Sequence, residues 1–511
     1  MLSSYSKNVG QSSHGAVPNG PRRAPTDGLV VASNFVQAVR DSGYVSLSTA
    51  LAELVDNSLQ AEARDIGITI EHLKNLAPVI EVHDDGHGMN RGELEACLQF
   101  GGTARFNDRR SFGRFGMGLP AASLSQSREV EVVSWQRGHK PMAVGLDVDA
   151  VAGGAAPRFT ASRRAIEVST PGGCIVTWRR CDRIEYQRLA WLERALHRDL
   201  GRIYRRFIAD GVRLTINGDR VKPIDPLHLA TTLEGRSASL AFDPLRYELA
   251  TPDGGTAFVD VRFSALPVEA WHHLDNLAKR RAGIVGAGGV SIMRAGREIA
   301  FGWHLMGDKR KENYDDWWRC EIEFEPALDE HFGITINKQG IRPSAELREA
   351  IEPEMEAIAR TLNARVRQAF EDVKFREATQ HSCRIAEAAD RNLPVVRGGR
   401  NRRSTGPLAY RLVSGPLSSG EMFETAVKNQ EITVTLNTDH PAFAALYRPL
   451  QGMSDGAGGT DLSTAGDLRT AIELLVLSYA RSSVVSAQGS RGQVDLMKIW
   501  SEAYAKMLQQ S

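Results

Sequence analysis

The sequence predicts an α+β protein of about three domains, and its length and two periodicities carry this prediction. The chain has 511 residues, and a domain usually holds roughly 100 to 200 of them. One apolar stripe recurs at helical spacing, made by Leu47, Leu51, Leu54, Val55 and Leu59. Residues 65–72, DIGITIEH, instead alternate apolar and polar positions as a half-buried strand does. Helices and strands are therefore expected to be mixed along the chain.

The composition excludes several classes of protein. Hydrophobic residues make up 42% and charged residues 24%, as in an ordinary soluble protein. The net charge is only +1, which excludes nucleic-acid binding by bulk charge and leaves only a local patch. No apolar run is long enough to span a membrane, and the first residues lack the apolar core of a secretory signal. Five scattered cysteines without a CxxC argue against a zinc site and favour a cytoplasmic location.

The first part of the chain begins with a predicted disordered tail. Residues 1–28 are rich in Ser, Gly, Pro and Asn, and an arm that orders on a partner is the alternative. The elements predicted next are helices within 29–63, strands at 65–72 and 78–85, a helix at 91–99, a loop at 100–118, a helix from Pro120, strands around 129–135 and 173–178, and a helix at about 185–209. Asn217 and Gly218 then mark the turn of a hairpin.

A second pattern begins after Pro226. Its predicted elements are a strand at 257–266, a helix at 267–281, a strand pair at 289–301, a strand at 317–326, a long charged helix at 344–389, a linker at 397–403, and a strand followed by a helix within 434–447. Residues 407–511 are expected to form a small module of strands and helices.

Glu53 and Asn57 are the first candidate site residues. They lie four positions apart on a predicted helix, so they share a face beside the apolar stripe. A carboxylate and a carboxamide one turn apart suit the activation of water and the coordination of magnesium, which takes oxygen ligands and keeps several waters. A solvated polar helix face is the alternative interpretation.

The second candidate is the segment DDGHGM, residues 84–89, directly after an apolar strand. Gly86 and Gly88 allow tight backbone turning and close approach of a ligand. Asp84, at the end of the strand, can accept a hydrogen bond from the amino group of a base. An ordinary turn is the alternative, because Asp-Gly pairs are common in turns. His87 is expected to be a bystander.

The third candidate is a glycine-rich segment that runs into a predicted helix at Pro120. Its residues of interest are Gly101, Gly102, Gly113, Arg114, Phe115, Gly116, Met117, Gly118 and Leu119. A helix N-terminus offers free N–H groups and a positive dipole end to phosphates. The segment is not a P-loop, because it has no GK[ST]. A surface loop without a ligand is the alternative.

In this order and spacing, the three segments resemble the motifs of the GHKL ATPases, the superfamily of gyrase, heat-shock chaperones, histidine kinases and MutL. The resemblance covers about residues 29–225. The stretches LAELVDNSLQA, DDGHGM and FGRFGMGLPAAS are most similar to the MutL and Microrchidia (MORC) branch and its bacterial relatives. The resemblance implies a Bergerat α/β sandwich that binds ATP and Mg²⁺ and hydrolyses ATP.

The resemblance also implies a role for each candidate. Glu53 would be the general base, Asn57 would hold Mg²⁺, and Asp84 would bind the adenine amino group. Gly86, Gly88 and Met89 would shape the adenine pocket. The nucleotide's phosphates would be wrapped by Gly101, Gly102, Gly113, Arg114, Phe115, Gly116, Met117, Gly118 and Leu119.

Three positions depart from the family pattern. Gln60 stands where relatives often have Asp, which the roles above do not need. Cys174 stands where many members place a Thr behind the adenine, and a thiol is a weaker hydrogen-bonding group than a hydroxyl. Pro120 stands where some relatives have Lys, so positive charge in the lid would come from Arg105 or Arg114.

Residues 332–340, FGITINKQG, resemble the loop by which the second domain of gyrase, MutL and MORC proteins brings a lysine to the γ-phosphate. Here that lysine is Lys338, whose charge would stabilise phosphoryl transfer; a surface lysine in a turn is the alternative. With the strand pair at 289–301, this resemblance implies a ribosomal-S5-like transducer domain. The expected division is a tail at 1–28, the ATPase domain at 29–226, the transducer at 227–343, a long helix at 344–396, a linker at 397–406 and a C-terminal module at 407–511.

The resemblance implies an ATP-gated homodimeric clamp that acts on DNA or with a partner nuclease, in genome maintenance or antiviral (phage) defence. A chaperone-like ATPase that acts on a protein client is the alternative. Several basic groups could bind phosphates, but a solvated linker or helix face is the favoured interpretation. These groups are Arg391 with Arg397, Arg400, Arg402 and Arg403; Lys279 with Arg280 and Arg281; and Arg202 with Arg205 and Arg206.

Overall fold

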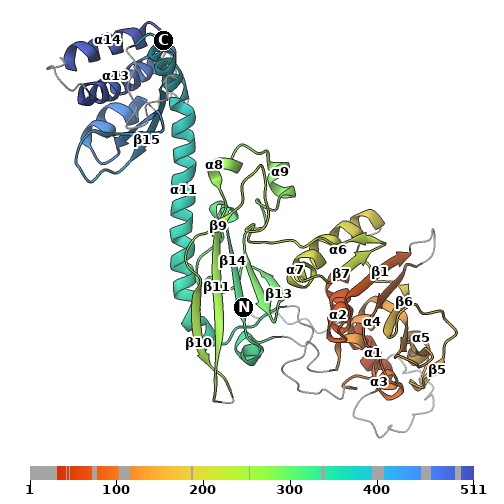
Figure 1. Ribbon diagram of the computed structural model, residues 1–511. Helices are drawn as coiled ribbons and strands as arrows, with labels where there is room; N and C mark the ends of the chain where they lie inside the picture. The colour runs from red at the N-terminus through yellow and green to blue at the C-terminus, as the bar shows by residue number, and fades with distance from the viewer. Residues whose placement is uncertain are drawn as a thin grey trace, which may run out of the picture. The chain divides into compact units, whose positions relative to one another are not determined.

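The computed structural model divides the chain into two compact units (Figure 1). The structure describes residues 31–41, 43–44, 46–71, 77–102, 116–185, 188–252, 254–334, 340–393, 408–450, 462–488 and 496–510. The first unit comprises Met1–Ile224, Arg294–Ala300 and Pro326–Arg342. The second unit comprises Asp225–Met293, Phe301–Glu325 and Pro343–Ser511. The predicted tail at 1–28 and the linker at 397–403 lie outside the described residues.

The first unit is a mixed α/β structure built on one sheet. In its described part the sheet has eight strands in the order β5-β4-β3-β6-β2-β1-β7-β8. Its strands are β1 (Asp65–Glu71), β2 (Val79–Asp84), β3 (Ser127–Trp135), β4 (Met142–Asp147), β5 (Ser162–Arg163), β6 (Gly173–Cys181), β7 (Arg213–Ile216) and β8 (Asp219–Arg220). Its helices are α1 (Ala32–Asp41), α2 (Leu47–Gln60), α3 (Arg91–Ala96), α4 (Gly118–Gln126), α5 (Val148–Ala152), α6 (Leu189–Ile203), α7 (Arg205–Ala209) and, after the 3-10 turn η2 (Pro326–Leu328), α10 (Asp329–Phe332).

Helix α2 forms where the apolar stripe predicts it. Ser46 caps its N-terminus by accepting a hydrogen bond from the backbone N–H of Thr49, which satisfies one of the N–H groups left over in the first turn. Leu47, Leu51 and Leu54 are buried in the core of the unit. The same helix buries two carboxylates, so its polar side is also turned inward in part.

Strands β1 and β2 confirm the predicted strands at 65–72 and 78–85. They pair antiparallel, with Ile66 opposite Asp84, and their apolar side chains alternate into the core. Strand β6 lies on the other side of β2 and places Cys174 opposite Asp84. The last residue of β2 is therefore flanked on both sides within the sheet. This pairing fixes where the DDGHGM segment begins.

A second sheet has the order β10-β11-β14-β12-β13, with β9 beside β11. Its strands are β9 (Ser239–Leu240), β10 (Leu245–Ala250), β11 (Thr256–Ala265), β12 (Val290–Arg294), β13 (Arg297–Gly302) and β14 (Trp318–Phe324). The short helices near it in the chain are α8 (Val268–Trp271), α9 (Asn276–Arg281) and the 3-10 helix η1 (Asn313–Trp317). The transducer name and the predicted domain boundaries remain predictions.

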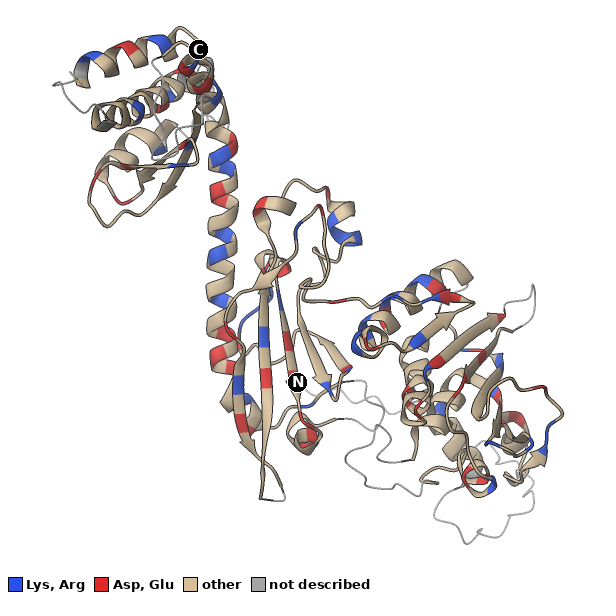
Figure 2. Cartoon of the chain, in the orientation of Figure 1, with Lys and Arg blue, Asp and Glu red and all other residues tan. Residues whose placement is uncertain are grey.

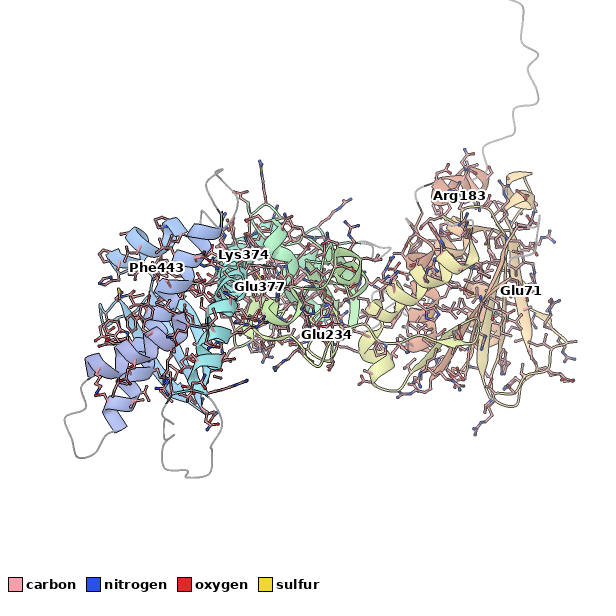
Figure 3. The ribbon with its side chains drawn as sticks, turned by 90° about the horizontal axis from the view of Figure 1, so that it is seen from above. Glu71, Arg183, Glu234, Lys374, Glu377 and Phe443 are labelled. Atoms are coloured by element: carbon pink, nitrogen blue, oxygen red, sulfur yellow. The ribbon has the colours of Figure 1, made fainter. Side chains whose placement is uncertain are left out.

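The long helix α11 (Ala345–Asp390) leads into the C-terminal module. Lysines and arginines alternate with acidic residues along it (Figure 2). The module contains a sheet in the order β15-β17-β16. Phe443, labelled in Figure 3, stacks on Tyr447 at a ring-centroid distance of 5.4 Å. Its elements are β15 (Ala409–Gly415), β16 (Phe423–Lys428), β17 (Glu431–Asn437), the π-helical turn η3 (Phe443–Tyr447), α13 (Leu462–Gln488) and α14 (Leu496–Leu508).

Two predicted helices are each divided in two. The predicted helix at 185–209 breaks at Tyr204, whose backbone leaves helical values (φ −104°, ψ 18°), so α6 and α7 are separate helices. The predicted helix at 267–281 is α8 and α9, because the Asp275 side chain accepts a hydrogen bond from the N–H of Ala278 and begins a new helix. The predicted helix at 91–99 ends at Ala96. No helix in the described part of the chain is long and apolar enough to cross a membrane.

Candidate functional site

Asp84 is held as an acceptor at the end of β2. The Ser58 hydroxyl donates to its Oδ2 at 2.8 Å, and the Gly86 N–H donates to its Oδ1 at 3.0 Å. Asp84 is 9% exposed. Burial raises the pKa of its carboxyl, and the bonds from Ser58 and Gly86 oppose that rise. The side chain is therefore fixed in one orientation, with further lone pairs for a donor such as an amino group.

The backbone that follows Asp84 packs too closely for side chains. Gly88 has a φ of +70°, and a Cβ there would lie 1.9 Å from the carbonyl oxygen of Trp135. The Met89 N–H donates to the Ser134 hydroxyl at 2.8 Å, and that hydroxyl donates to the carbonyl of Gly173 at 2.9 Å. The DDGHGM turn is thereby fastened to β3 and β6.

Cys174 lies beside Asp84, as the register of β2 and β6 requires. Burial, followed by the nearby Asp84 and Cys97, raises the pKa of its thiol well above the ordinary value. Cys174 is thus a neutral thiol at neutral pH. A neutral thiol is a weak hydrogen-bonding partner for a base.

Glu53 faces the beginning of α4. Its side chain is buried, and a Cβ added to Gly118 would lie 2.5 Å from Glu53 Oε2. The Tyr44 hydroxyl is hydrogen-bonded to the Glu53 carboxylate. The structure therefore brings the first and third predicted segments together. Only glycine leaves room for the carboxylate at this point of the third segment.

Asn57 lies one turn after Glu53 on α2 and is exposed. An exposed carboxamide oxygen beside a buried carboxylate is a suitable ligand for a cation that also binds phosphate oxygens and water. The residues present therefore fit Mg²⁺ held between the protein and a phosphate chain.

The two ends of the glycine-rich segment meet, because the Gly101 N–H donates to the carbonyl of Gly116 at 3.1 Å. The described residues of this segment are Gly101, Gly102, Gly116, Met117, Gly118 and Leu119. The predicted site residues Gly113, Arg114, Phe115 and Lys338 lie outside the described residues, as does Arg105. His87 is exposed, and its Nδ1 lies 2.6 Å from the carbonyl of Gly88, so it is occupied locally.

Three further residues support the site and were not predicted from the sequence. Ser58 holds Asp84, Tyr44 contacts Glu53, and Ser134 fastens Met89. Ser58 follows Leu54 by one helical turn, so its place beside the stripe could have been found. Tyr44 and Ser134 carry no local signal. Among the basic groups, Arg202 and Arg205 form ion pairs with Glu298 and are not free phosphate ligands.

Comparison with known proteins finds similarity over the part of the chain that holds these residues. Residues 45–167 match the family described as histidine kinase-, DNA gyrase B- and HSP90-like ATPase. This part of the chain is similar to the ATPases of the GHKL superfamily, including MORC and MutL proteins.

Three relatives show this likeness. The chain is 33% identical over 105 residues to ATPase morc-1 of Caenorhabditis elegans, which is 20% of this chain and 12% of the relative. It is 43% identical over 61 residues to DNA mismatch repair protein MutL of Acidiphilium cryptum (strain JF-5), 12% of this chain and 10% of the relative. It is 30% identical over 94 residues to Protein MICRORCHIDIA 5 of Arabidopsis thaliana, 17% of this chain and 13% of the relative. The chain thus spans only a small part of each relative.

Proposed function

We propose that this protein binds ATP with Mg²⁺ and hydrolyses it to ADP and phosphate. The observation that carries the proposal is the packing of the buried Glu53 carboxylate against Gly118, where the glycine-rich segment enters α4. Phosphates at this helix N-terminus would meet free N–H groups and the positive end of the helix dipole. A water molecule between the terminal phosphate and Glu53 would then have a base in contact.

The chemistry follows from the positions of the side chains. Asp84 accepts a hydrogen bond from the adenine amino group, which fixes one end of the nucleotide. Asn57 would hold Mg²⁺, which would neutralise charge on the phosphate oxygens. Glu53 takes a proton from the attacking water while the water oxygen bonds to the γ-phosphorus. The bond between the γ-phosphorus and the oxygen that stays with ADP breaks. Lys338 is proposed to stabilise the charge that develops on the γ-phosphate.

Asp84→Ala tests the nucleotide pocket. The variant loses a hydrogen bond to a charged acceptor, a net contribution of about 1.5 to 3 kcal/mol. Its affinity for a nonhydrolysable ATP analogue should fall by about 10- to 160-fold in calorimetry. Asp85→Asn is the matched control, because Asp85 Oδ1 only accepts bonds from the N–H groups of Arg64 and Asp65. Equal affinity of wild type and Asp84→Ala would contradict the assignment of adenine to this pocket.

We further propose that ATP closes a homodimer that acts on DNA or with a partner nuclease, in genome maintenance or antiviral defence. The name of the MutL relative, a DNA mismatch repair protein, supports the choice of DNA. Only ATP carries the γ-phosphate that Lys338 would contact, so only ATP is expected to favour the closed state. Light scattering after size exclusion should show a larger mass with ATP than with ADP or without nucleotide.

Duplex DNA separates this proposal from a chaperone-like ATPase. A clamp on DNA should hydrolyse ATP faster with DNA present, and its DNA affinity should fall steeply with salt because phosphate contacts release counterions. A constant mass with every nucleotide would contradict gated dimerisation. Stimulation by an unfolded protein client and not by DNA would favour the chaperone-like function.

A further inference from the structure

A buried charged cluster lies directly behind the proposed general base. Asp56 is on α2, between Glu53 and Asn57, and is fully buried. Arg297 Nε donates to Asp56 Oδ1 at 2.8 Å. The Tyr204 hydroxyl lies 2.7 Å from the same oxygen and 2.6 Å from the carbonyl of Ala52. We call Asp56, Tyr204 and Arg297 the α2 triad.

The α2 triad joins parts of the first unit that are far apart in the sequence. Arg297 is 241 residues from Asp56 and comes from the segment Arg294–Ala300, which belongs to the first unit. Tyr204 lies at the break between α6 and α7. The α2 backbone is held at Ala52 and its side chain at Asp56, so two points of one helical turn are fixed. This turn carries Glu53.

Arg297 is itself held by its neighbour in the chain. Glu298 accepts from Arg202 Nε at 2.6 Å and from Arg205 at 3.2 Å, and its side chain is almost completely buried. Arg294, at the other end of the segment, makes a two-fold contact with Asp329 at 2.6 and 2.8 Å. The segment that carries Arg297 is thus tied to α6, α7 and α10. A guanidinium fixed in this way has little freedom to follow α2 if the helix turns.

The positive charge of Arg297 also interacts with the carboxylate of Glu53. Burial lowers the pKa of Arg297, but Asp56, Tyr204 and then Glu53 raise it above the ordinary value on balance. One buried cation therefore lies near two buried carboxylates of α2. A carboxylate buried without a cation would be costly and would move or take up a proton.

We infer that Arg297 is a positioning residue for the reaction, which fixes the rotation of α2 through Asp56 and Tyr204 so that the Glu53 carboxylate stays against Gly118. The inference rests on the proposed function. Arg297 contacts Asp56, whereas Ser58, near the other end of α2, is held by its own hydrogen bond to Asp84. Loss of Arg297 should therefore lower turnover much more than ATP affinity. The alternative is that the α2 triad only stabilises the fold.

The C-terminal module supplies a matched control of the same chemistry. Arg481 Nε donates to Asp390 Oδ1 at 2.6 Å, and the Tyr410 hydroxyl donates to the same oxygen at 3.1 Å. We call Asp390, Tyr410 and Arg481 the C-terminal triad. Its arginine and aspartate are buried to a similar degree. Loss of Arg481 should therefore cost stability as loss of Arg297 does.

The experiment compares Arg297→Met and Arg481→Met in the full chain, at a temperature at which both are folded by circular dichroism. Arg297→Met should lower kcat by about 10- to 100-fold, as small misplacements of reacting groups do. Its affinity for a nonhydrolysable ATP analogue should stay close to that of the wild type. Arg481→Met should keep both values. Arg297→Lys keeps the positive charge but lacks the planar guanidinium, so its kcat should lie between those of Arg297→Met and the wild type. Arg297→Lys replaces Arg297→Met in the experiment if Arg297→Met does not fold.

The decisive measurement is Arg297→Met combined with Glu53→Gln. If Arg297 acts through Glu53, adding Arg297→Met to Glu53→Gln should not lower the residual turnover of Glu53→Gln any further. The effects of two residues that act as a unit on kcat are not additive. The inference would be overturned if Arg297→Met lowered kcat by the same factor in the wild type and in Glu53→Gln. An unchanged kcat in Arg297→Met alone would also overturn it. Wild-type turnover in Glu53→Gln alone would instead refute the proposed function, so the two failures are distinct.

Discussion

The α2 triad and the C-terminal triad have the same chemistry and different neighbours. Each buries an Arg–Asp pair with a Tyr hydroxyl on the aspartate. Each region also buries a glutamate hydrogen-bonded to a tyrosine, Glu53 to Tyr44 and Glu473 to Tyr447. A buried charged network is therefore no sign of a site in itself.

The two glutamates, Glu53 and Glu473, differ in the groups that surround their carboxylates. Glu53 lies against Gly118 at the N-terminus of α4, one turn from the exposed Asn57. Glu473 also accepts from Ser382 and pairs with Arg469 at 3.4 Å, so protein groups surround it. Its carboxylate contacts packing partners, whereas that of Glu53 contacts the beginning of a glycine-rich segment. The comparison predicts that similar substitutions will act on turnover in one region and on stability in the other.

Glu53→Gln against Glu473→Gln is the largest expected contrast. Glu53→Gln should lower kcat by about 10²- to 10⁴-fold with ATP still bound, because only the base is lost. Glu473→Gln should keep kcat and change the thermal unfolding of the C-terminal module. Phosphate release and scanning calorimetry measure the two effects. Equal turnover in both variants would contradict a role in hydrolysis that Glu53 has and Glu473 lacks.

Gly118→Ala against Gly466→Ala should give the next largest contrast. A methyl group at Gly118 would meet Glu53 Oε2 at 2.5 Å, so the carboxylate must move, and kcat should fall by up to about 10²-fold. Among the described residues, nothing lies within 4 Å of a Cβ at Gly466 on α13. That variant should keep its turnover and lose no stability, because alanine favours a helix more than glycine does. A kcat of Gly118→Ala equal to that of the wild type would show that Glu53 can act from another position.

Ser58→Ala against Ser482→Ala should give the smallest effect, on the pH dependence of ATP affinity. Burial raises the pKa of Asp84, and the Ser58 hydroxyl opposes the rise. The ionised carboxylate of Asp84 accepts a hydrogen bond from the adenine amino group. The affinity for ATP is therefore kept at a pH above the pKa of Asp84 and lost as the pH falls through it. Ser58→Ala should raise the pKa further and move the loss to higher pH.

Calorimetry with an ATP analogue, from the ordinary carboxyl pKa of about 3.9 up to neutral pH, measures this shift; ionisation of the nucleotide contributes equally in all variants. Ser482 only donates to the carbonyl of Ser478, so Ser482→Ala should leave the curve unchanged. Identical curves for Ser58→Ala and the wild type would contradict the role of Ser58.

The local patterns predicted much of the first unit. The stripe from Leu47 to Leu59 predicted α2, and the alternation in DIGITIEH predicted β1, because burial of one face leaves a period in the sequence. The proximity of Glu53 to the glycine-rich segment followed from the resemblance, and the structure agrees at Gly118. These features depend on short stretches of chain.

The supporting residues could not be predicted in this way. Arg297 reaches Asp56 across 241 positions, and no period or motif marks such a pair. At Tyr204, where α6 ends, the side-chain hydroxyl donates to the carbonyl of Ala52 on α2, a tertiary contact that the helical pattern of 185–209 does not encode. The roles of Lys338 and of residues 113–115 remain predictions.

A structure of the full chain with Mg²⁺ and a nonhydrolysable ATP analogue tests the proposed nucleotide site most directly. We expect the adenine amino group within about 3 Å of Asp84. We also expect Mg²⁺ at Asn57, and the terminal phosphate between Glu53 and the N–H groups at Gly118. A nucleotide whose adenine lies away from Asp84, or whose terminal phosphate lies away from Glu53, would contradict it.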